Sequence, residues 1–196
     1  SNVDANQIAK FSDLIQKRYQ LRLQNFKKTS EVLSAADQMF DLFNESYAKL
    51  PSFVPISERQ KEYFKKKYLT FINPEYIKFV FDNDGKMIAF AITMPSFSKA
   101  LQRANGKLSL WGILHLLWAK RYSKTAILYL IGVLPEYQNK GVTSLLFASL
   151  KTEYDKRGVQ IAHRTPELED NTAIQSLWKD FDPYVTQRRA TYMKEI

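Results

Sequence analysis

The chain has 196 residues, a length typical of one globular domain, and folding buries roughly 70% of the surface that an unfolded chain of this size exposes. Cysteine is absent and histidine occurs only at His115 and His163, so disulfide frameworks, thiolate nucleophiles, iron–sulfur clusters and cysteine zinc sites are excluded, and we expect no metal site. The formal net charge of +9 favours an anionic partner, which includes nucleic acid, a membrane surface or a phosphorylated small molecule.

The first 18 residues form a polar segment that we expect to be at least partly helical, with residues 1–2 as a possible tag remnant. This segment lacks the apolar stretch of a signal peptide, and we therefore expect a cytoplasmic protein. We assign residues 19–196 to a single domain. It should open with a strand over residues 19–26, where leucines alternate with polar residues.

Two helices should follow this strand. One begins near Ser30, carries its apolar residues at helical spacing and ends before Pro51. The other begins at Ser57, which forms a capping box with Gln60, and ends before Pro74. Because this second helix mixes basic and aromatic residues, nucleic-acid binding is one interpretation of it. We favour a solvated basic face with inward-facing aromatic rings, and we expect no specific nucleic-acid partner.

Residues 76–81 and 86–94 are strand-like runs separated by Asp82, Asn83, Asp84 and Gly85, a turn sequence typical of a β-hairpin. Residues 96–121 should form a helical insertion that contains the apolar run LSLWGILHLLW at 108–118. This run is too short to span a bilayer, so no transmembrane span is expected. We favour a buried helix or a lid for it, and a helix on a membrane surface is the alternative because basic residues follow at once.

The second half of the domain alternates strands and helices. Residues 125–135 form a long apolar strand, 138–157 a helix that stops at Gly158, 159–165 a short strand, 171–181 a helix and 186–196 a terminal strand. These elements predict a mixed α/β (α+β) fold with one central sheet flanked by helices.

The junction between the long strand and its helix is the segment most suited to chemistry. Residues 134–143 read LPEYQNKGVT, so a strand ends, a turn passes and a helix begins. The first N–H groups of a helix have no partners within it and attract anions, and Gly141 lets an anion approach the backbone closely. The spacing matches neither a Walker A loop nor a dinucleotide-binding turn.

The stretch GVLPEYQNKGVTSLLFASL resembles the acyl-CoA motif Q/R-x-x-G-x-G/A of the GNAT superfamily of N-acyltransferases, and EDNTAIQSLW resembles a later motif of the same family. The stretches VPISERQ, NPEY, MPSFSKAL and ANGKL resemble the C-terminal half of a bacterial group of tandem GNAT proteins, which implies a preceding N-terminal domain. The resemblance implies a mostly antiparallel sheet that splays near Val133. It also implies a set of residues that bind the cofactor: Ile131, Gly132, Val133, Gln138, Asn139, Lys140, Gly141, Val142, Thr143, Asn171 and Trp178.

The activity that the resemblance implies is transfer of an acetyl group from acetyl-CoA, the co-substrate, to an unidentified amine by direct attack. Thr143 stands where Gly or Ala is usual, and Trp178 stands where many members have a proton-donating tyrosine. The alternative is therefore a degenerate GNAT-like domain that binds acyl-CoA, or supports a partner domain, without turnover. Glu75, Tyr76 and Glu136 are candidate bases by position only, and no catalytic residue is assigned.

Overall fold

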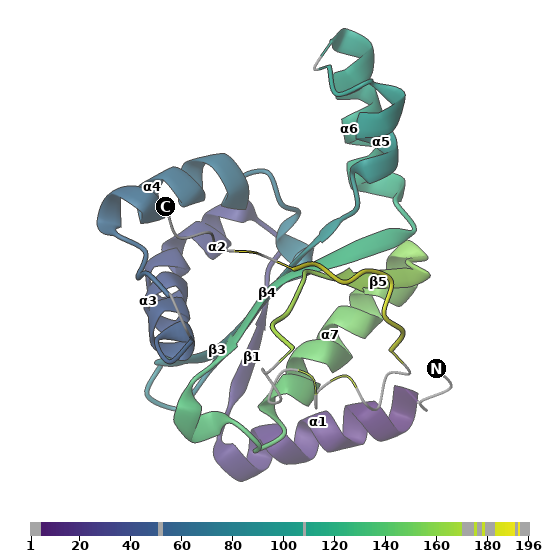
Figure 1. Cartoon of the computed structure of the whole chain (residues 1–196). Helices are drawn as coiled ribbons and strands as arrows, with labels where there is room; N and C mark the ends of the chain where they lie inside the picture. The colour runs from purple at the N-terminus through teal and green to yellow at the C-terminus, as the bar shows by residue number, and fades with distance from the viewer. Residues whose placement is uncertain are drawn as a thin grey trace.

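The fold is a five-stranded sheet with helices on both faces, as a computed structural model shows (Figure 1). The structure describes residues 5–50, 53–107, 109–169, 175, 178, 183–190 and 192. The strands lie in the order β1-β2-β3-β4-β5, the same order as in the sequence. The predicted mixed α/β fold with a mostly antiparallel sheet is confirmed.

Each strand of the sheet pairs with its neighbours in sequence. The strands are β1 (Arg22–Asn25), β2 (Ile77–Phe81), β3 (Met87–Pro95), β4 (Thr125–Val133) and β5 (Ile161–Arg164). The first four run antiparallel, and β5 pairs parallel with β4. The β2–β3 hairpin forms at the expected turn, where the Asp82 carboxylate accepts the backbone N–H groups of Asp84 and Lys86 and Gly85 has a φ of +79°.

One face of the sheet is covered by α2 (Thr29–Ser34), α3 (Ala36–Tyr47) and α4 (Glu58–Phe64), which continues as a π-helical turn at Lys65–Leu69. The single helix expected from Ser30 is therefore two helices that meet at Ala35. The Ser34 hydroxyl donates to the carbonyl oxygen of Glu31 at 2.8 Å, a local bond of the kind that competes with helix propagation.

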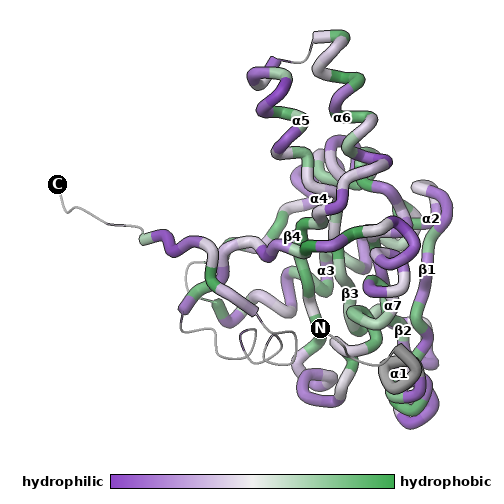
Figure 2. The backbone as a smooth tube through the Cα atoms, turned by 90° about the vertical axis from the view of Figure 1, so that its right-hand side faces the viewer, coloured by the Kyte–Doolittle hydropathy of each residue, from purple (hydrophilic) through white to green (hydrophobic). Residues whose placement is uncertain are grey.

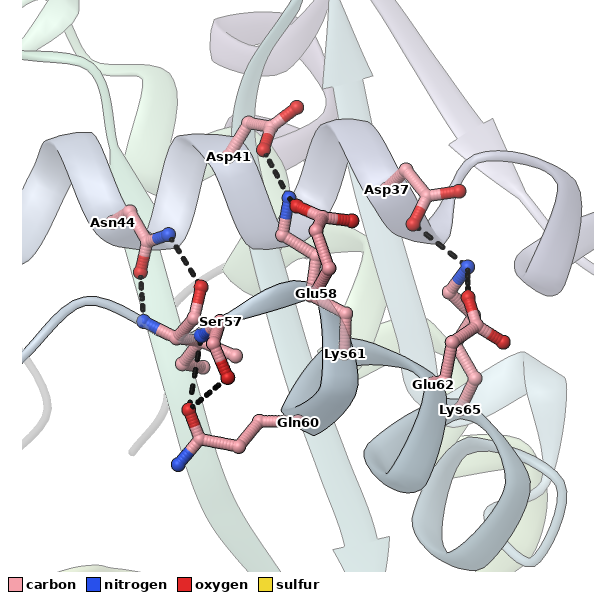
Figure 3. A network of polar contacts seen from close by, with 10 residues as sticks. Asp37, Asp41, Asn44, Ser57, Glu58, Gln60, Lys61, Glu62 and Lys65 are labelled. Atoms are coloured by element: carbon pink, nitrogen blue, oxygen red, sulfur yellow. Dashed lines mark hydrogen bonds and ion pairs between the residues drawn. The ribbon is translucent and has the colours of Figure 1, made fainter.

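A network of polar contacts holds α4 against α3 (Figure 3). Lys61 is almost fully buried, and its ammonium lies 2.6 Å from Asp41 and 2.7 Å from Glu58. Lys65 likewise lies 2.7 Å from Asp37 and 2.6 Å from Glu62. These carboxylates neutralise two of the lysines that suggested nucleic-acid binding. The aromatic rings do not all face inward as expected, since Tyr63 and Tyr68 are about half exposed.

The other face of the sheet is covered by α7 (Val142–Arg157), with α1 (Ala5–Tyr19) lying across its N-terminal end (Figure 1). Helix α1 includes Tyr19, so the first strand is shorter than expected and begins at Arg22. The expected helix after β5, at residues 171–181, lies almost entirely outside the described residues. Of the expected terminal strand, residues 186–190 and 192 are described and form no strand.

Between β3 and β4 the chain forms the helices α5 (Ser98–Arg103) and α6 (Leu110–Tyr122), followed by a return to the sheet. The expected insertion is present, but the interpretation of its apolar run as a buried helix is wrong. Figures 1 and 2 show the two helices projecting from one end of the sheet, and most large apolar side chains of α6 are exposed. None of the helices in the described ranges combines the length and hydrophobicity that a membrane span requires.

Lys78 is a charged residue inside the sheet. Its side chain, on β2, is 3% exposed and its ammonium donates to the Asn25 side chain at 2.8 Å. Burial lowers the pKa of Lys78 to about 8. Between about pH 8 and pH 10.4, the usual lysine value, the folded chain therefore binds fewer protons than the unfolded chain, so stability contributed by this group rises with pH.

Replacing Lys78 with Met should raise the free energy of unfolding at pH 7 by about 2 kcal/mol, since removing the desolvated charge outweighs one lost hydrogen bond. The melting temperature of the wild type should rise relative to that of K78M between pH 8 and pH 10. Thermal melts of both proteins across this range measure the difference. A difference in melting temperature between the two proteins that stays constant from pH 8 to pH 10 would contradict the lowered pKa of Lys78.

Candidate active site

Strands β4 and β5 separate part of the way along β4. The parallel pairing between them joins Thr125 to Ile161 and ends with Leu128 and Arg164, whereas β4 stays paired with β3 as far as Val133. The β3–β4 register also shifts, so that Tyr129 is an extra residue on β4. A bulge of this kind bends a strand. Over residues 129–133, β4 has no partner strand on this side among the described residues, and we call this stretch the opening.

The β3–β4 register determines which backbone groups of β4 face this opening. Leu134 donates its N–H to the carbonyl of Ile88 on β3. Gly132 lies opposite Phe90, two residues along each strand, so its N–H and C=O groups also point toward β3. In an antiparallel pair the intervening residues turn their N–H and C=O groups the other way, so those of Ile131 and Val133 face the opening. The backbone of Gly132 faces β3, and a Cβ there would collide with the Phe90 ring.

Two side chains contact the carbonyl groups at this opening. The Tyr47 hydroxyl, at the end of α3, donates to the Ile131 carbonyl at 2.8 Å, and the Gln138 amide donates to the Val133 carbonyl at 3.2 Å. The Tyr47 ring stacks on Phe43 with centroids 4.5 Å apart. Burial, opposed by the bond to Ile131, raises the pKa of Tyr47, and the nearby Glu167 carboxylate raises it further. Tyr47 is therefore a neutral phenol at physiological pH.

The loop after β4 leads into the N-terminus of α7. Pro135–Tyr137 forms one 3₁₀ turn, Asn139 and Gly141 adopt positive φ angles of 60° and 77°, and α7 begins at Val142. No side chain caps this helix, and its first turn holds no acidic residue. Turns of this type point successive backbone N–H groups outward, and the helix dipole adds partial positive charge. The loop and the first turn of α7 therefore have the geometry of a phosphate site.

Gly141 is required for a reason that the sequence did not show. A Cβ on Gly141 would lie 2.9 Å from Ile15 Cδ1 and 3.3 Å from Phe11 Cζ, both on α1. The side that the missing Cβ leaves free is thus occupied by α1, and the positive φ is the second requirement for glycine. Any contact of Gly141 with an anion must come from its backbone. Lys140 is exposed, with its ammonium over the rings of Tyr19 and Tyr137.

Beyond β5, Glu167 and Trp178 form a cluster that packs on α7. The Trp178 indole is 6% exposed, donates to the Glu167 carboxylate at 3.0 Å and contacts the Phe147 ring with centroids 5.0 Å apart. Arg164 lies 3.0 Å from Glu167 and also covers the indole ring. Burial raises the pKa of Glu167, while Arg164 and the indole oppose that shift. Trp178 thus holds a carboxylate in place near Tyr47.

Replacing Trp178 with Phe should change turnover by less than about tenfold, or ~1.4 kcal/mol of activation free energy, because the new ring keeps the packing against Phe147. The assay is the reaction that the sequence resemblance implies, which is release of free CoA from acetyl-CoA in the presence of amines. A loss of a hundredfold or more, with unchanged acetyl-CoA affinity and melting temperature, would instead assign the indole a part in the reaction.

The three positional candidates for a base lie in ion pairs or in the core. Glu136 pairs with Lys86 at 3.6 Å, and Glu75 pairs with Arg157 at 3.5 Å. Arg157 ends α7, about 24 Å along the helix axis from the loop at its start. Tyr76 is buried and packs against Tyr154. Sequence reasoning missed Tyr47 and Glu167. Tyr47 falls at the helical spacing of the apolar residues in the helix expected from Ser30 and so reads as a core residue.

Other expected site residues are Asn171, which lies outside the described residues, and Thr143, which is half-buried in the first turn of α7. Within the described ranges, no three His, Asp or Glu side chains gather in an arrangement that would hold a metal ion. The described candidate site therefore consists of the β4 backbone, the α7 N-terminus, Tyr47 and the Glu167–Trp178 pair.

The candidate site thus combines a sheet that separates beside a β4 bulge with an uncapped helix N-terminus. Residues 36–182 match the acetyltransferase (GNAT) family. This match covers well over half of the chain, and the chain belongs to the GNAT acetyltransferase family. Members of this family are typically acetyltransferases that use acetyl-CoA as the donor.

Comparison with individual proteins gives one distant relative and several proteins of the same fold. Protein YghO of Escherichia coli (strain K12) is 24% identical over 195 residues, which cover 96% of this chain and 49% of YghO. The chain therefore spans about half the length of this curated relative.

Three solved structures illustrate the shared fold. An aminoglycoside acetyltransferase from an uncultured soil metagenomic sample, in complex with sisomicin, is 12% identical, with a TM-score of 0.55 and coverage of 92% of this chain and 99% of its own. AAC(6')-Iy with a CoA-linked bisubstrate analogue is 16% identical, with a TM-score of 0.52 and coverage of 90% and 99%. Ard1 from Thermoplasma volcanium is 11% identical, with a TM-score of 0.52 and coverage of 85% and 84%. At these identities the likeness concerns the fold.

Proposed function

We propose that this chain transfers an acetyl group from acetyl-CoA to an amine by direct attack of the amine on the thioester. The observation that carries the proposal is the separation of β4 from β5 after Leu128, because the backbone groups of Ile131 and Val133 that face away from β3 are then not paired with β5. Tyr47 lies beside them. Acetyl-CoA supplies the activated thioester. The identity of the acceptor amine is outside this proposal.

Different segments of the chain bind different parts of acetyl-CoA. The N–H groups of residues 139–143 hold the pyrophosphate, with Lys140 exposed beside them. The neighbouring N–H groups of Gln138 and Ser144 already donate to the carbonyls of Pro135 and Gly141. The amide groups of Ile131 and Val133 orient the pantetheine arm along β4. The N–H of Val133 then polarises the thioester carbonyl, and one such donor typically contributes about 10²- to 10³-fold in rate.

Tyr47 is our candidate for the acid that protonates the departing thiolate. Its hydroxyl reaches the middle of the opening, at the Ile131 carbonyl, and its raised pKa keeps the proton on the phenol oxygen. The Trp178 indole cannot donate a proton at neutral pH, so a phenol supplied from α3 restores the function that the sequence alone suggested was missing. Glu167 lies near enough to influence Tyr47 electrostatically, and its own carboxylate pairs with Arg164. The neutral amine forms the C–N bond as the C–S bond breaks, Tyr47 gives its proton to the thiolate, and the proton that the amine nitrogen loses returns through solvent to the Tyr47 oxygen.

Turnover separates this proposal from the alternative of a domain that only binds acyl-CoA. Purified protein should release free CoA from acetyl-CoA when supplied with an accepted amine, and a panel of small amines and peptide N-termini tests this. Micromolar acetyl-CoA binding, about −8 kcal/mol, with no CoA release across the panel would support the binding-only function. Absence of any binding at millimolar ligand would contradict both.

A further inference from the structure

The helical hairpin of residues 96–124, here called the α5–α6 hairpin, lies apart from the candidate active site. It leaves the sheet where β3 ends at Pro95 and returns where β4 begins at Thr125. The opening lies toward the other end of β4, at Ile131 and Val133, and the nine residues of this strand span about 30 Å. Figure 1 shows the hairpin projecting from the body at the end where β4 begins, away from the opening.

Helix α6 turns its small residues inward. Gly112 and Ala119 are buried, and a Cβ on Gly112 would collide with the carbonyl oxygen of Lys107 and lie 3.3 Å from Ala104 Cβ. The Ser109 hydroxyl caps the helix by accepting the Gly112 N–H at 3.2 Å. The hairpin is therefore a closely packed unit, in which the inner face of α6 is already occupied.

The outer face of α6 is apolar. Leu110 is 82% and Trp111 is 75% exposed. Further exposed positions on this face are Ile113, Leu114, Leu117, Trp118 and Tyr122. Counted from Leu110, these positions include i+3, i+4, i+7 and i+8. Apolar residues at this spacing form the side of a helix that normally packs against a protein core. Here that stripe is exposed along a helix about 20 Å long. Figure 2 shows the helix projecting from the body of the protein.

The charge around this face is of one sign. Between Ser96 and Lys124 the sequence has no Asp or Glu, and its basic residues are Lys99, Arg103, Lys107, Lys120, Arg121 and Lys124. All but the half-buried Lys120 are exposed. None of the six forms an ion pair with a described residue, in contrast to Lys61 and Lys65 on the body. Their charge is available to an anionic partner.

We propose that the α5–α6 hairpin binds the surface of an anionic lipid bilayer. The outer face of α6 lies at the boundary between headgroups and acyl chains, where tryptophan and tyrosine side chains are favoured. The surrounding lysines and arginines contact lipid phosphates. A bilayer fits this convex apolar ridge without a complementary groove, whereas a second copy of the hairpin would bring six further positive charges against the first six.

Vesicle flotation with the purified chain tests the proposal. Vesicles of phosphatidylcholine with 30% phosphatidylglycerol should carry the protein upward at about 100 mM salt, and vesicles of phosphatidylcholine alone should carry at least about tenfold less. The variant W111S/W118S should lose at least about tenfold in partitioning, and so should K107Q/R121Q/K124Q. All variants should keep the wild-type affinity for acetyl-CoA, which shows that they are folded.

Matched controls come from the body of the protein. V54S alters an exposed apolar residue, K66Q/K67Q removes two exposed lysines, and neither should change flotation. The proposal is overturned if the wild type does not float with anionic vesicles, or if W111S/W118S floats as well as the wild type. It is also overturned if sedimentation shows a dimer that W111S/W118S dissociates and no vesicle binding is seen, because a second copy then covers this face.

Discussion

Replacing Thr143 with Glu should weaken acetyl-CoA binding by about a hundredfold or more, or ~2.7 kcal/mol, without lowering the melting temperature. Thr143 is the second residue of α7, whose first turn has no acidic side chain and whose N-cap provides no side-chain bond. A carboxylate at this place interacts favourably with the helix dipole, worth about 0.3–1 kcal/mol. The same carboxylate repels a pyrophosphate that uses these N–H groups.

The glutamate is expected to stabilise the folded protein slightly and to weaken acetyl-CoA binding. A loss of affinity in this variant therefore cannot be explained by unfolding. Isothermal titration with acetyl-CoA measures the affinity, and calorimetry or circular dichroism measures the melting temperature. Thr143→Gln is the matched control with the same shape and no charge, and Thr143→Ala restores a residue usual for the family. Equal acetyl-CoA affinity in the Glu and Gln variants would show that the α7 N-terminus does not hold the phosphates.

Thr143 is a better position than Gly141 for testing the phosphate site. A side chain at Gly141 would first meet Ile15 and Phe11 of α1 and would be strained by the φ of 77°. A glutamate there would therefore disturb the packing of α1 on α7 as well as any phosphate contact. Loss of binding in such a variant would have two explanations.

Replacing Tyr47 with Phe should lower kcat by about a hundredfold, which is the low end of the usual contribution of a general acid. The phenylalanine ring keeps the contacts with Phe43 and Phe53, so packing changes little. The acetyl-CoA affinity should stay within about threefold, since a ligand amide competes with the hydroxyl for the Ile131 carbonyl. Release of free CoA under saturating acetyl-CoA measures the effect.

Two further readouts distinguish an acid from a structural residue. Because burial raises the pKa of Tyr47 above its usual value of about 10, the wild-type rate should show no loss from this group below about pH 10. Trp178→Phe, in the same assay, provides the comparison with an expected change below tenfold. Unchanged kcat in Tyr47→Phe would contradict the assigned role, and a parallel fall in melting temperature and acetyl-CoA affinity would make Tyr47 a support for β4.

The sequence by itself determined the features that depend on neighbouring residues. The Asp82 to Gly85 turn, the capping box of Ser57 and Gln60 and the αL stop at Gly158 are encoded within a few residues, and all three occur in the structure. The strand–turn–helix junction at residues 134–143 also follows from local pattern. These local signals were sufficient for the family resemblance and for the order of the five strands that the described residues form.

The tertiary structure decided which groups meet across large separations. Tyr47 and Ile131 are 84 residues apart, and no local pattern relates them. Likewise, only the packing of α1 shows what lies against Gly141. The large apolar side chains of helix α6 fall at the spacing that normally marks an inward face, so the sequence pattern points the wrong way. In the structure the small residues Gly112 and Ala119 are buried instead, and the large side chains are exposed.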